Sequence, residues 1–477
     1  MIVVISDLHF EEEASDVISG RGLPDVIFQR NLSPRAYRNF IAQMAEQAAR
    51  RKVKEFQLVI AGDLFDFSRT TLWFSDALRP YVALEKVDER LEQKTLAILE
   101  ATAKEPFVKE ALEVFRLLAK GRYRTTEAAD SEERDFPADR IEIFYFPGNH
   151  DRLSNATPAI RKRVRELLGL NGSAEFPHYF LASDPAALIR HGHEYDNDNF
   201  AIDLERSKSI PLEVPERGYS EANFGDFITI DVAVRLPYLF RRKYGDLAIV
   251  DDPGMAKLYE RLLQFDDVRP QSALFDYLFD DSAGDYSAEE AWERLVPVIQ
   301  DLLDEILDQK FFRYWLRKRA KPWAPVELEA ALGLLKWGGW RNRASREAAR
   351  RIARFMMGGD MACPEFVARH EKLLEEKRIR LVIAGHTHEP KLCLLASDPE
   401  ADRFYINSGT WRNCIFSTPD ERRFARVEAL TYVMLFSSAE DSRLGNRTLG
   451  TFDYWTGYTQ HFEDEPENKR ETRDSPA

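Results

Sequence analysis

The sequence predicts an α/β core that is interrupted by a large, mainly helical insertion. From residue 1 to about 196, short segments rich in β-branched residues alternate with amphipathic helical segments, and the same alternation returns from about 376 to 436. The interval between them is patterned as helix and holds five of the eight tryptophans of the chain. The predicted boundaries are a core formed by residues 1–196 and 376–462, a helical cap at 197–375, and a polar, disordered tail at 463–477.

Five short apolar runs are the expected core strands, and each one leads within a few residues to His, Asp or Asn. In chain order the segments are IVVISDLH (2–9), LVIAGDLFD (58–66), FYFPGNHD (144–151), ALIRHGH (187–193) and LVIAGHTH (381–388). Six of the nine histidines lie in these segments, which leaves His178, His370 and His461 outside them. Such a concentration of histidine indicates a shared role.

Helical patterns fill the intervals between the strands. Residues 88–121 place apolar side chains at helical spacing, and we expect them to cover one face of the sheet. Within the cap, residues 236–245 and 310–323 interleave aromatic and basic side chains, and arginines recur at helical spacing. The arginines are Arg343, Arg346, Arg350 and Arg354.

Composition restricts the classes of function. The formal net charge of −14 argues against broad, sequence-blind binding of nucleic acid, which needs an excess of Lys and Arg. Cys363, Cys393 and Cys414 show neither disulfide nor zinc-ligand spacing, so we expect a reducing, cytoplasmic location. We expect neither a leader peptide nor a membrane-spanning helix, because the sequence shows no leader pattern and no apolar run of sufficient length. Peripheral contact with a membrane stays open.

The polar side chains at the strand ends form a mixed set of oxygen and imidazole donors. Loops at the carboxyl ends of neighbouring strands converge in space, so residues far apart in the chain can share one site. Such a set suits two divalent transition ions that share a carboxylate. The candidate metal ligands are Asp7, His9, Asp63, Asn149, His191, His386 and His388.

These five motifs, in this order, resemble the signature of the calcineurin-like metallophosphoesterases. The resemblance covers about 60% of the chain and implies a four-layer α-β-β-α core. It also implies that Asp7, His9 and His388 hold one metal, that Asn149, His191 and His386 hold the other, and that Asp63 bridges them. The reaction implied is hydrolysis of a phosphoester by a metal-activated hydroxide. We expect Mn²⁺, with Fe, Zn²⁺ and Co²⁺ as alternatives, because ligand identity does not select among them.

Residues beside the expected ligands are assigned supporting or catalytic roles. We expect His150 to protonate the leaving oxygen or to stabilise charge on the phosphoryl group, and Asp151 to orient His150. Asp66 is expected to support the site without being a ligand, and Arg152 is a candidate for substrate binding. The role of His193 is left open: it either binds substrate or is a loop histidine that does not contact the metal. Asn407, Ser408 and Gly409 are expected to support the metal loops.

The motifs favour some substrate classes over others. The protein Ser/Thr phosphatase pattern is missing, because Asp66 is followed by Phe67 and His150 by Asp151. The layout is similar to UDP-2,3-diacylglucosamine hydrolases, which also place a helical cap before the last motif, but theirs is shorter and they carry Arg at the position of His150. We therefore expect cleavage of a phosphodiester or pyrophosphate in a phosphorylated small or amphiphilic substrate.

Two alternatives remain at this stage. One is a nuclease similar to the double-strand-break repair exonucleases, which share the Gly-Asn-His-Asp motif, and the other is a non-catalytic binding scaffold that keeps the fold. The basic and aromatic cap segments are open between a substrate lid, a nucleic-acid or lipid contact, and an ordinary solvated helix face over the core of the cap. Oligomeric state and the choice among monoester, diester and pyrophosphate are not decided by any motif.

Overall fold

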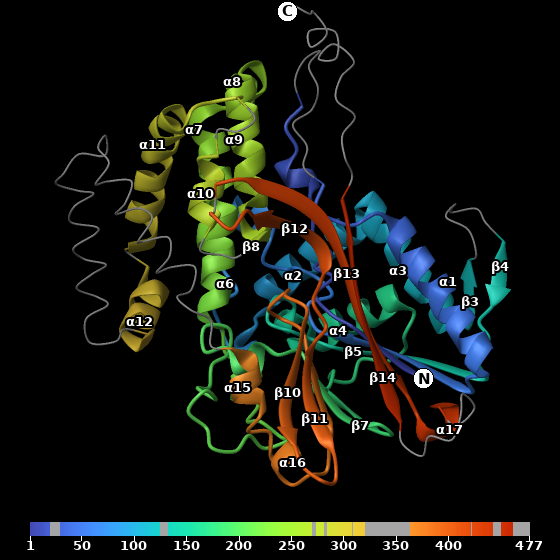
Figure 1. The fold of residues 1–477 in the computed structure, drawn as a ribbon. Coiled ribbons are helices and arrows are strands. Elements are labelled where there is room, and N and C mark those ends of the chain that lie inside the picture. The colour runs from blue at the N-terminus through green and yellow to red at the C-terminus, as the bar shows by residue number, and fades with distance from the viewer. Residues whose placement is uncertain are drawn as a thin grey trace, which may run out of the picture.

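The structure is an α/β protein built around two large mixed sheets (Figure 1). It is a computed structural model that describes residues 1–19, 29–124, 132–269, 273–280, 284–307, 309–319, 363–420, 422–441 and 450–460. The predicted tail at 463–477, residues 320–323 of the basic segment 310–323, and the arginines Arg343, Arg346, Arg350 and Arg354 lie outside the described residues. Within those residues, no helix combines the length and the apolarity that a membrane span requires.

The larger sheet has seven strands, in which parallel strands from the first half of the chain join antiparallel strands from the end. Its path is β5 (Arg140–Phe146), β2 (Glu55–Ala61), β1 (Ile2–Ile5), β13 (Phe424–Phe436), β12 (Trp411–Ser417) and β8 (Val268–Arg269), with β14 (Thr451–Thr459) paired to β13. β1, β2 and β5 are parallel to one another. The long strand β13 has β14 along one edge, while β12 and β1 share its other edge.

The smaller sheet has five strands and brings two further motifs to the core. Its order is β10 (Lys391–Ser397), β11 (Asp402–Asn407), β9 (Leu381–Ala384), β7 (Ala186–Arg190) and β6 (Tyr179–Ser183). β7, β9 and β11 are parallel, and the two outer strands are antiparallel to their neighbours. A separate hairpin pairs β3 (Arg122–Arg124) with β4 (Glu133–Asp135).

The two sheets pack face to face through a buried apolar layer. Side chains alternate between the faces of a strand, so Val4 of β1 and Val59 of β2 point inward and meet Ile189 of β7 and Ile383 of β9. Val3 and Leu58 point to the opposite face and join a different apolar cluster. The register of these central strands is therefore fixed by burial on both faces.

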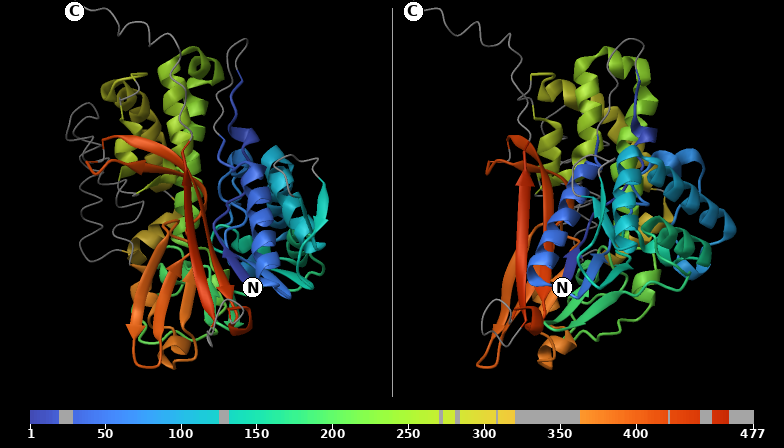
Figure 2. Two further views of the ribbon diagram at one scale, coloured as in Figure 1. Left: turned by 45° about the vertical axis from the view of Figure 1, so that its right-hand side comes forward. Right: turned by 90° about the vertical axis from the view of Figure 1, so that its right-hand side faces the viewer.

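Helices cover the outer face of the larger sheet, as the sequence predicted. They are α1 (Pro34–Arg51), α2 (Glu89–Lys104), α3 (Pro106–Ala119) and α4 (Pro158–Leu168). The predicted helical stretch 88–121 is two helices, because Pro106 has no backbone N–H and begins a new helix. On the smaller sheet, residues from 195–219 and from two short helices pack against the outer face. These helices are α15 (Pro364–Ala368) and α16 (Lys372–Glu375). Figure 2 shows α1 and α3 on one side of the paired sheets.

The insertion forms its own helical cluster beside the sheets (Figure 1). The helices of this cluster are α6 (Phe224–Ile228), α7 (Arg235–Tyr244), α8 (Asp246–Asp251), α9 (Pro253–Gln264), α10 (Leu274–Leu278), α11 (Ala288–Leu307) and α12 (Lys310–Arg319), whereas α5 (Arg217–Ser220) packs on the smaller sheet. The apolar core of this cluster comes from residues between 224 and 315, with Ile18 and Ile415 added from the core. The predicted cap, 197–375, is wider than this cluster, since residues before 224 and after 363 pack on the smaller sheet.

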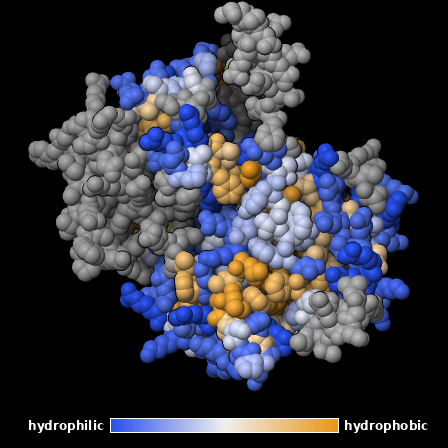
Figure 3. Space-filling model, viewed as in Figure 1, coloured by the Kyte–Doolittle hydropathy of each residue, from blue (hydrophilic) through white to orange (hydrophobic). Residues whose placement is uncertain are grey.

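One edge of the smaller sheet carries exposed apolar side chains. β10 is the last described strand at that edge, and its Leu392 and Leu394 are 49% and 54% exposed. Figure 3 shows hydrophobic residues gathered on this face of the molecule, where β10 lies in Figure 1. This edge is therefore apolar as well as unpaired among the described strands.

Candidate metal centre

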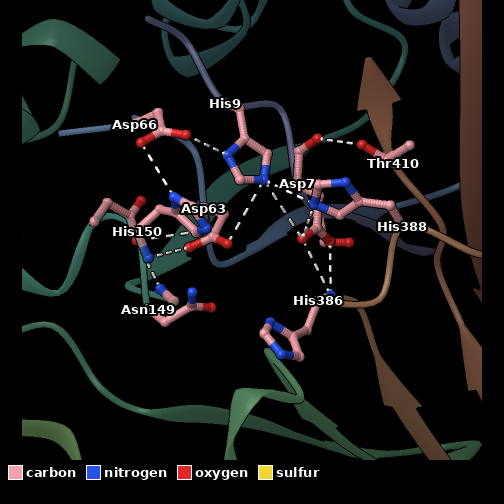
Figure 4. A network of polar contacts seen from close by, with 12 residues as sticks. Asp7, His9, Asp63, Asp66, Asn149, His150, His386, His388 and Thr410 are labelled. Carbon is pink, nitrogen blue, oxygen red and sulfur yellow. Dashed lines mark hydrogen bonds and ion pairs between the residues drawn. The ribbon is translucent and has the colours of Figure 1, made fainter. Parts of the chain in front are cut away.

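The loops that follow five strands bring their polar side chains to one place (Figure 4). Three overlapping groups have donor atoms within 4.8 Å of one another. The groups are Asp7, His9 and His388; His9, Asp63 and His150; and Asp63, His191 and His386. Because His9 and Asp63 each belong to two groups, the set is continuous. With Asn149, which contacts His191, we call these residues the strand-end cluster.

The backbone of the strand-end cluster is strained. Seven non-glycine residues in the described part of the chain have a left-handed backbone, and five belong to the cluster. They are Asp7, His9, Asp63, His386 and His388, with φ between 46° and 72°. A residue with a side chain rarely adopts this conformation, which costs of order 1 kcal/mol or more. Strain collected where donor atoms converge is typical of a functional site.

Glycines beside the cluster are required by close approach. A Cβ atom on Gly148 would collide with Asp63 and the His191 ring, and one on Gly385 would collide with Asp7 and Ser6. Neither position therefore accepts a larger residue without moving a candidate ligand. The glycines of the motifs allow the loops to bring their side chains this close.

His191 is held in an orientation that directs one nitrogen into the cluster. Its Nδ1 lies 2.8 Å from the carbonyl of Ala61 and donates to it, while Nε2 lies 3.1 Å from Asp63 Oδ2 and 3.2 Å from Asn149 Oδ1. Burial lowers the pKa of His191, but Asp63 and Asp7 outweigh it and raise the pKa to about 10. The oxygens of Asp63 and Asn149 around Nε2 therefore favour a positive charge at this position.

The remaining ligands are braced in the same way. His9 Nδ1 lies 3.0 Å from Asp66, which leaves Nε2 facing Asp7 and Asp63. The backbone N–H of His386 donates to the Asp7 carboxylate at 3.0 Å, so the last motif is tied to the first. Burial raises the pKa of Asp7 and of Asp63, but the surrounding imidazoles outweigh burial and hold both well below the usual range. The cluster therefore keeps two buried negative charges.

The supporting roles of two carboxylates differ from the prediction. Asp151 does not orient His150. Its carboxylate instead accepts hydrogen bonds from two loops and from one hydroxyl. The donors are the backbone N–H groups of Asp63, Leu64, Phe65 and Gly148 and the hydroxyl of Tyr145. Asp66 contacts His150 instead, 3.1 Å from its Nδ1. The sequence neighbour of His150 faces away from the ring because it ties the two loops together.

Other predicted site residues have structural contacts. The guanidinium of Arg152 is 6% exposed, pairs with Asp226, and donates to the carbonyls of Pro80, Val82 and Ser220. It therefore joins the core to the insertion rather than lining the cluster. His193 is buried outside the three donor groups, and burial, with His191 and His386 adding to it, lowers its pKa to about 3.

The supporting strand after the last motif is confirmed. Asn407 Nδ2 donates to the carbonyl of Gly385 at 2.7 Å, and the Ser408 hydroxyl donates to that of Ala384. Thr410, in the same segment, donates to the carbonyl of Asp7 at 2.8 Å (Figure 4). These bonds hold the loops of the first and last motifs together.

The basic residues of segment 236–245 are paired with acidic ones. Arg241 pairs with Asp246, Arg242 with Glu305 and Lys243 with Asp301. Within this segment, the arrangement fits the simpler interpretation of a solvated helix face, because the charges that a polyanion would need are already matched.

Three residues that contact the cluster were not identified from the sequence. Asp196 lies 3.0 Å from His386 Nε2, Asn199 accepts from Asn149 Nδ2 at 3.2 Å, and Arg269 of the insertion donates to His388 Nδ1 at 2.8 Å. The nearness of Asp196 to the His-Gly-His motif was an available signal. For Arg269 the sequence held no signal, because a two-residue strand has no period and its pairing with β12 is a long-range event.

The donor set fits divalent cations. Asp7 and Asp63 supply two buried negative charges. In both His9 and His191, Nε2 faces the cluster, while Nδ1 is bonded to Asp66 in His9 and to the carbonyl of Ala61 in His191. Such outer bonds fix the ring and the tautomer of a metal-binding histidine. Comparisons with protein-family models and with curated proteins found no match to the chain.

Proposed function

We propose that this protein is a metal-dependent phosphoesterase that hydrolyses a phosphodiester or pyrophosphate bond. The observation that carries the proposal is the position of Asp63, whose Oδ2 lies 3.6 Å from His9 Nε2 and 3.1 Å from His191 Nε2. A shared carboxylate between two sets of imidazoles is the arrangement expected for two neighbouring divalent ions. The order of helices, larger sheet, smaller sheet and outer helices supports the four-layer core that the resemblance implies.

Each of the two ions would have its own set of residues. Asp7, His9 and His388 would hold one, with Mn²⁺ as the expected metal. His191, His386 and Asn149 would hold the other, and Asp63 would lie between them. When bound, such a pair of ions lowers the pKa of a water molecule toward neutrality and neutralises phosphate charge during in-line displacement.

His150 is placed to act on the leaving oxygen. Its Nδ1 is engaged by Asp66, and its backbone N–H donates to Asp63 Oδ1 at 2.9 Å, so the ring is fixed beside the shared carboxylate. The side chain is also partly open, at 18% exposure, unlike the buried ring of His9. Nε2 is therefore the nitrogen from which a proton can reach a substrate oxygen.

The substrate class follows from charge and from the contacts of the insertion. The chain is acidic overall, and the described basic segment 236–245 is matched by carboxylates. These features favour a small or amphiphilic phosphorylated molecule over a long polyanion, whose binding depends on many free Lys and Arg side chains.

The test is hydrolysis of p-nitrophenyl phosphate and bis-p-nitrophenyl phosphate by metal-stripped protein with Mn²⁺ added back. We expect Mn²⁺-dependent cleavage of the diester, a large loss in Asn149→Ala, and full activity in the control His370→Ala, whose side chain lies outside the cluster. A diester rate that is the same in Asn149→Ala and in the native protein would refute the proposal.

A further inference from the structure

The insertion supplies a cation to the edge of the strand-end cluster. Arg269 belongs to β8, whose two residues pair with Ile415 and Phe416 of β12, so the backbone of the core sheet fixes its position. The residue is 8% exposed. Its Nη1 donates to the carbonyls of Asp266 and Val268 at 2.9 Å, and its Nη2 donates to His388 Nδ1 at 2.8 Å.

This last bond fixes the tautomer of His388. A guanidinium can only donate, so Nδ1 must offer its lone pair, and the ring proton must lie on Nε2. Nε2 is the nitrogen that faces the cluster, 2.9 Å from His9 Nε2 and 3.4 Å from Asp7 Oδ1. In this arrangement the proton on His388 Nε2 points toward Asp7, and this nitrogen has no free lone pair for an ion.

Metal binding by Nε2 needs the opposite tautomer. The lone pair must then lie on Nε2 and the proton on Nδ1, where it would face the N–H group of Arg269. Two donors cannot share one hydrogen bond, so Arg269 and an ion at His388 Nε2 exclude one another in this geometry. Arg269 must turn away from the ring when the ion binds.

The nearby carboxylates are engaged by other arginines through one oxygen each, while Asp267 Oδ2 is buried without a hydrogen-bond partner. Asp266 pairs with Arg69, and Asp267 lies 2.9 Å from Arg412 and 3.4 Å from Arg69. A guanidinium released from His388 would stand beside the cluster, with its Nη2 no longer bonded to the imidazole. A phosphate group suits it, since its oxygens match the paired N–H groups of arginine.

We propose that Arg269 is a substrate-binding residue, contributed by the insertion, that leaves His388 when metal binds and then contacts the phosphate group of the substrate. The inference rests on the proposed function for the identity of the ligand. It links the two steps in one order, because the phosphate-binding arginine becomes available only after the ion has taken its place.

The first test is the binding of Mn²⁺ alone, by calorimetry, to native protein and Arg269→Gln. Native protein must break the arginine–imidazole bond, so the variant is expected to bind Mn²⁺ about tenfold more tightly, roughly the contribution of one hydrogen bond to a charged group. The matched control is Arg242→Gln, which removes an exposed guanidinium of the insertion that pairs with Glu305 and touches no imidazole, and it is expected to bind Mn²⁺ as the native protein does. Unchanged or weaker Mn²⁺ binding by Arg269→Gln would overturn the inference.

The second test is the binding of inorganic phosphate to Mn²⁺-loaded protein. Arg269→Gln is expected to bind phosphate about tenfold more weakly. Arg269→Lys keeps the positive charge and controls for a folding defect. Its affinity for phosphate should lie between those of the native protein and Arg269→Gln, because an ammonium group cannot make the paired contact. Equal phosphate affinity in all three proteins would contradict the proposal.

A spectroscopic test addresses the tautomer directly. With Zn²⁺ as the diamagnetic ion, the side-chain ¹⁵N shifts of His388 should change from the Nε2–H form in metal-free protein to the Nδ1–H form in loaded protein. An Nδ1–H form without metal would refute the mechanism. None of these readouts uses hydrolysis, so a protein that passes them and yet cleaves no diester would contradict the proposed function alone.

Discussion

At the scale of single residues, the proposed two-ion centre depends most on the carboxylate of Asp63. It is 1% exposed and lies between imidazoles of both donor groups. Asp63→Asn replaces the shared charge with a neutral amide, so we expect Mn²⁺-dependent diester hydrolysis to fall by about a thousandfold or more, since charge stabilisation is often the largest catalytic term. The control is Asp76→Asn, an exposed carboxylate paired with Lys94. Steady-state kinetics with both variants checks this, and similar rates in the two would argue against a bridging role.

The pKa of His191 predicts a pH dependence of metal binding. In metal-free protein its pKa is raised from 6.5 to about 10, so the protonated ring stabilises the fold fully below pH 6.5, and this contribution is lost as the pH rises through about 10. An ion must displace that proton. We therefore expect Mn²⁺ affinity to rise about tenfold per pH unit between pH 7 and 9 for this one proton. Calorimetric titrations at several pH values measure the slope, and a flat profile would contradict the assignment.

The exchanged roles of Asp66 and Asp151 predict different defects. Asp66 contacts the His9 and His150 rings, so Asp66→Asn should lower metal affinity or turnover by about 10- to 100-fold with little change in stability. Asp151 accepts backbone hydrogen bonds, so Asp151→Asn places a donor against donors and should cost about 2 kcal/mol of unfolding free energy. Denaturation together with kinetics separates the two effects, and the reverse pattern would restore Asp151 as the residue that orients His150.

At the scale of secondary-structure elements, the strand-end loops are as important as the side chains that they carry. Gly148→Ala adds a Cβ that meets Asp63 and His191, so we expect much weaker Mn²⁺ binding in a protein that still folds. Gly172→Ala is the control for Mn²⁺ binding, because its Cβ would meet nothing within 4 Å and the strain of its positive φ falls outside the cluster. Native-like binding by Gly148→Ala would show that the loop can relax and that the close approach is not required.

Some elements were predictable from the sequence and others were not. Strands β1, β2, β5, β7 and β9 were predicted because each contains a short apolar run that leads into a polar motif. The contacts of Asp151 with backbone N–H groups were not predictable, since adjacency in sequence does not reveal which way a side chain points after a turn. The contribution of β8 was missed, because its contact with the cluster depends on pairing with a strand about 150 positions later in the chain.

At the scale of the whole molecule, buried ion pairs join the insertion to the core. Arg152 pairs with Asp226, and Arg69 and Arg412 of the core contact Asp267 of the insertion. Removal of one partner leaves a buried charge without its counterion, which costs about 3–5 kcal/mol. These contacts hold the insertion, and Arg269 with it, in a fixed position relative to the strand-end cluster.

Arg152→Ala tests this structural assignment. We expect a loss of about 3 kcal/mol in unfolding free energy, and a much smaller further loss when Asp226→Ala is added, because the two residues act together. The KM for a small diester should stay near the native value in protein that remains folded. A stable variant with a raised KM would instead return Arg152 to substrate binding.

The proposed two-ion centre is tested most directly by the number of Mn²⁺ ions that one chain binds. Calorimetry on metal-stripped protein measures this number for the native chain and for Asp63→Asn. Two ions per native chain, with at least one lost in the variant, are expected because the Asp63 carboxylate lies between His9 of one proposed ligand set and His191 of the other. A single ion in the native protein, or two retained without Asp63, would contradict a shared two-ion centre.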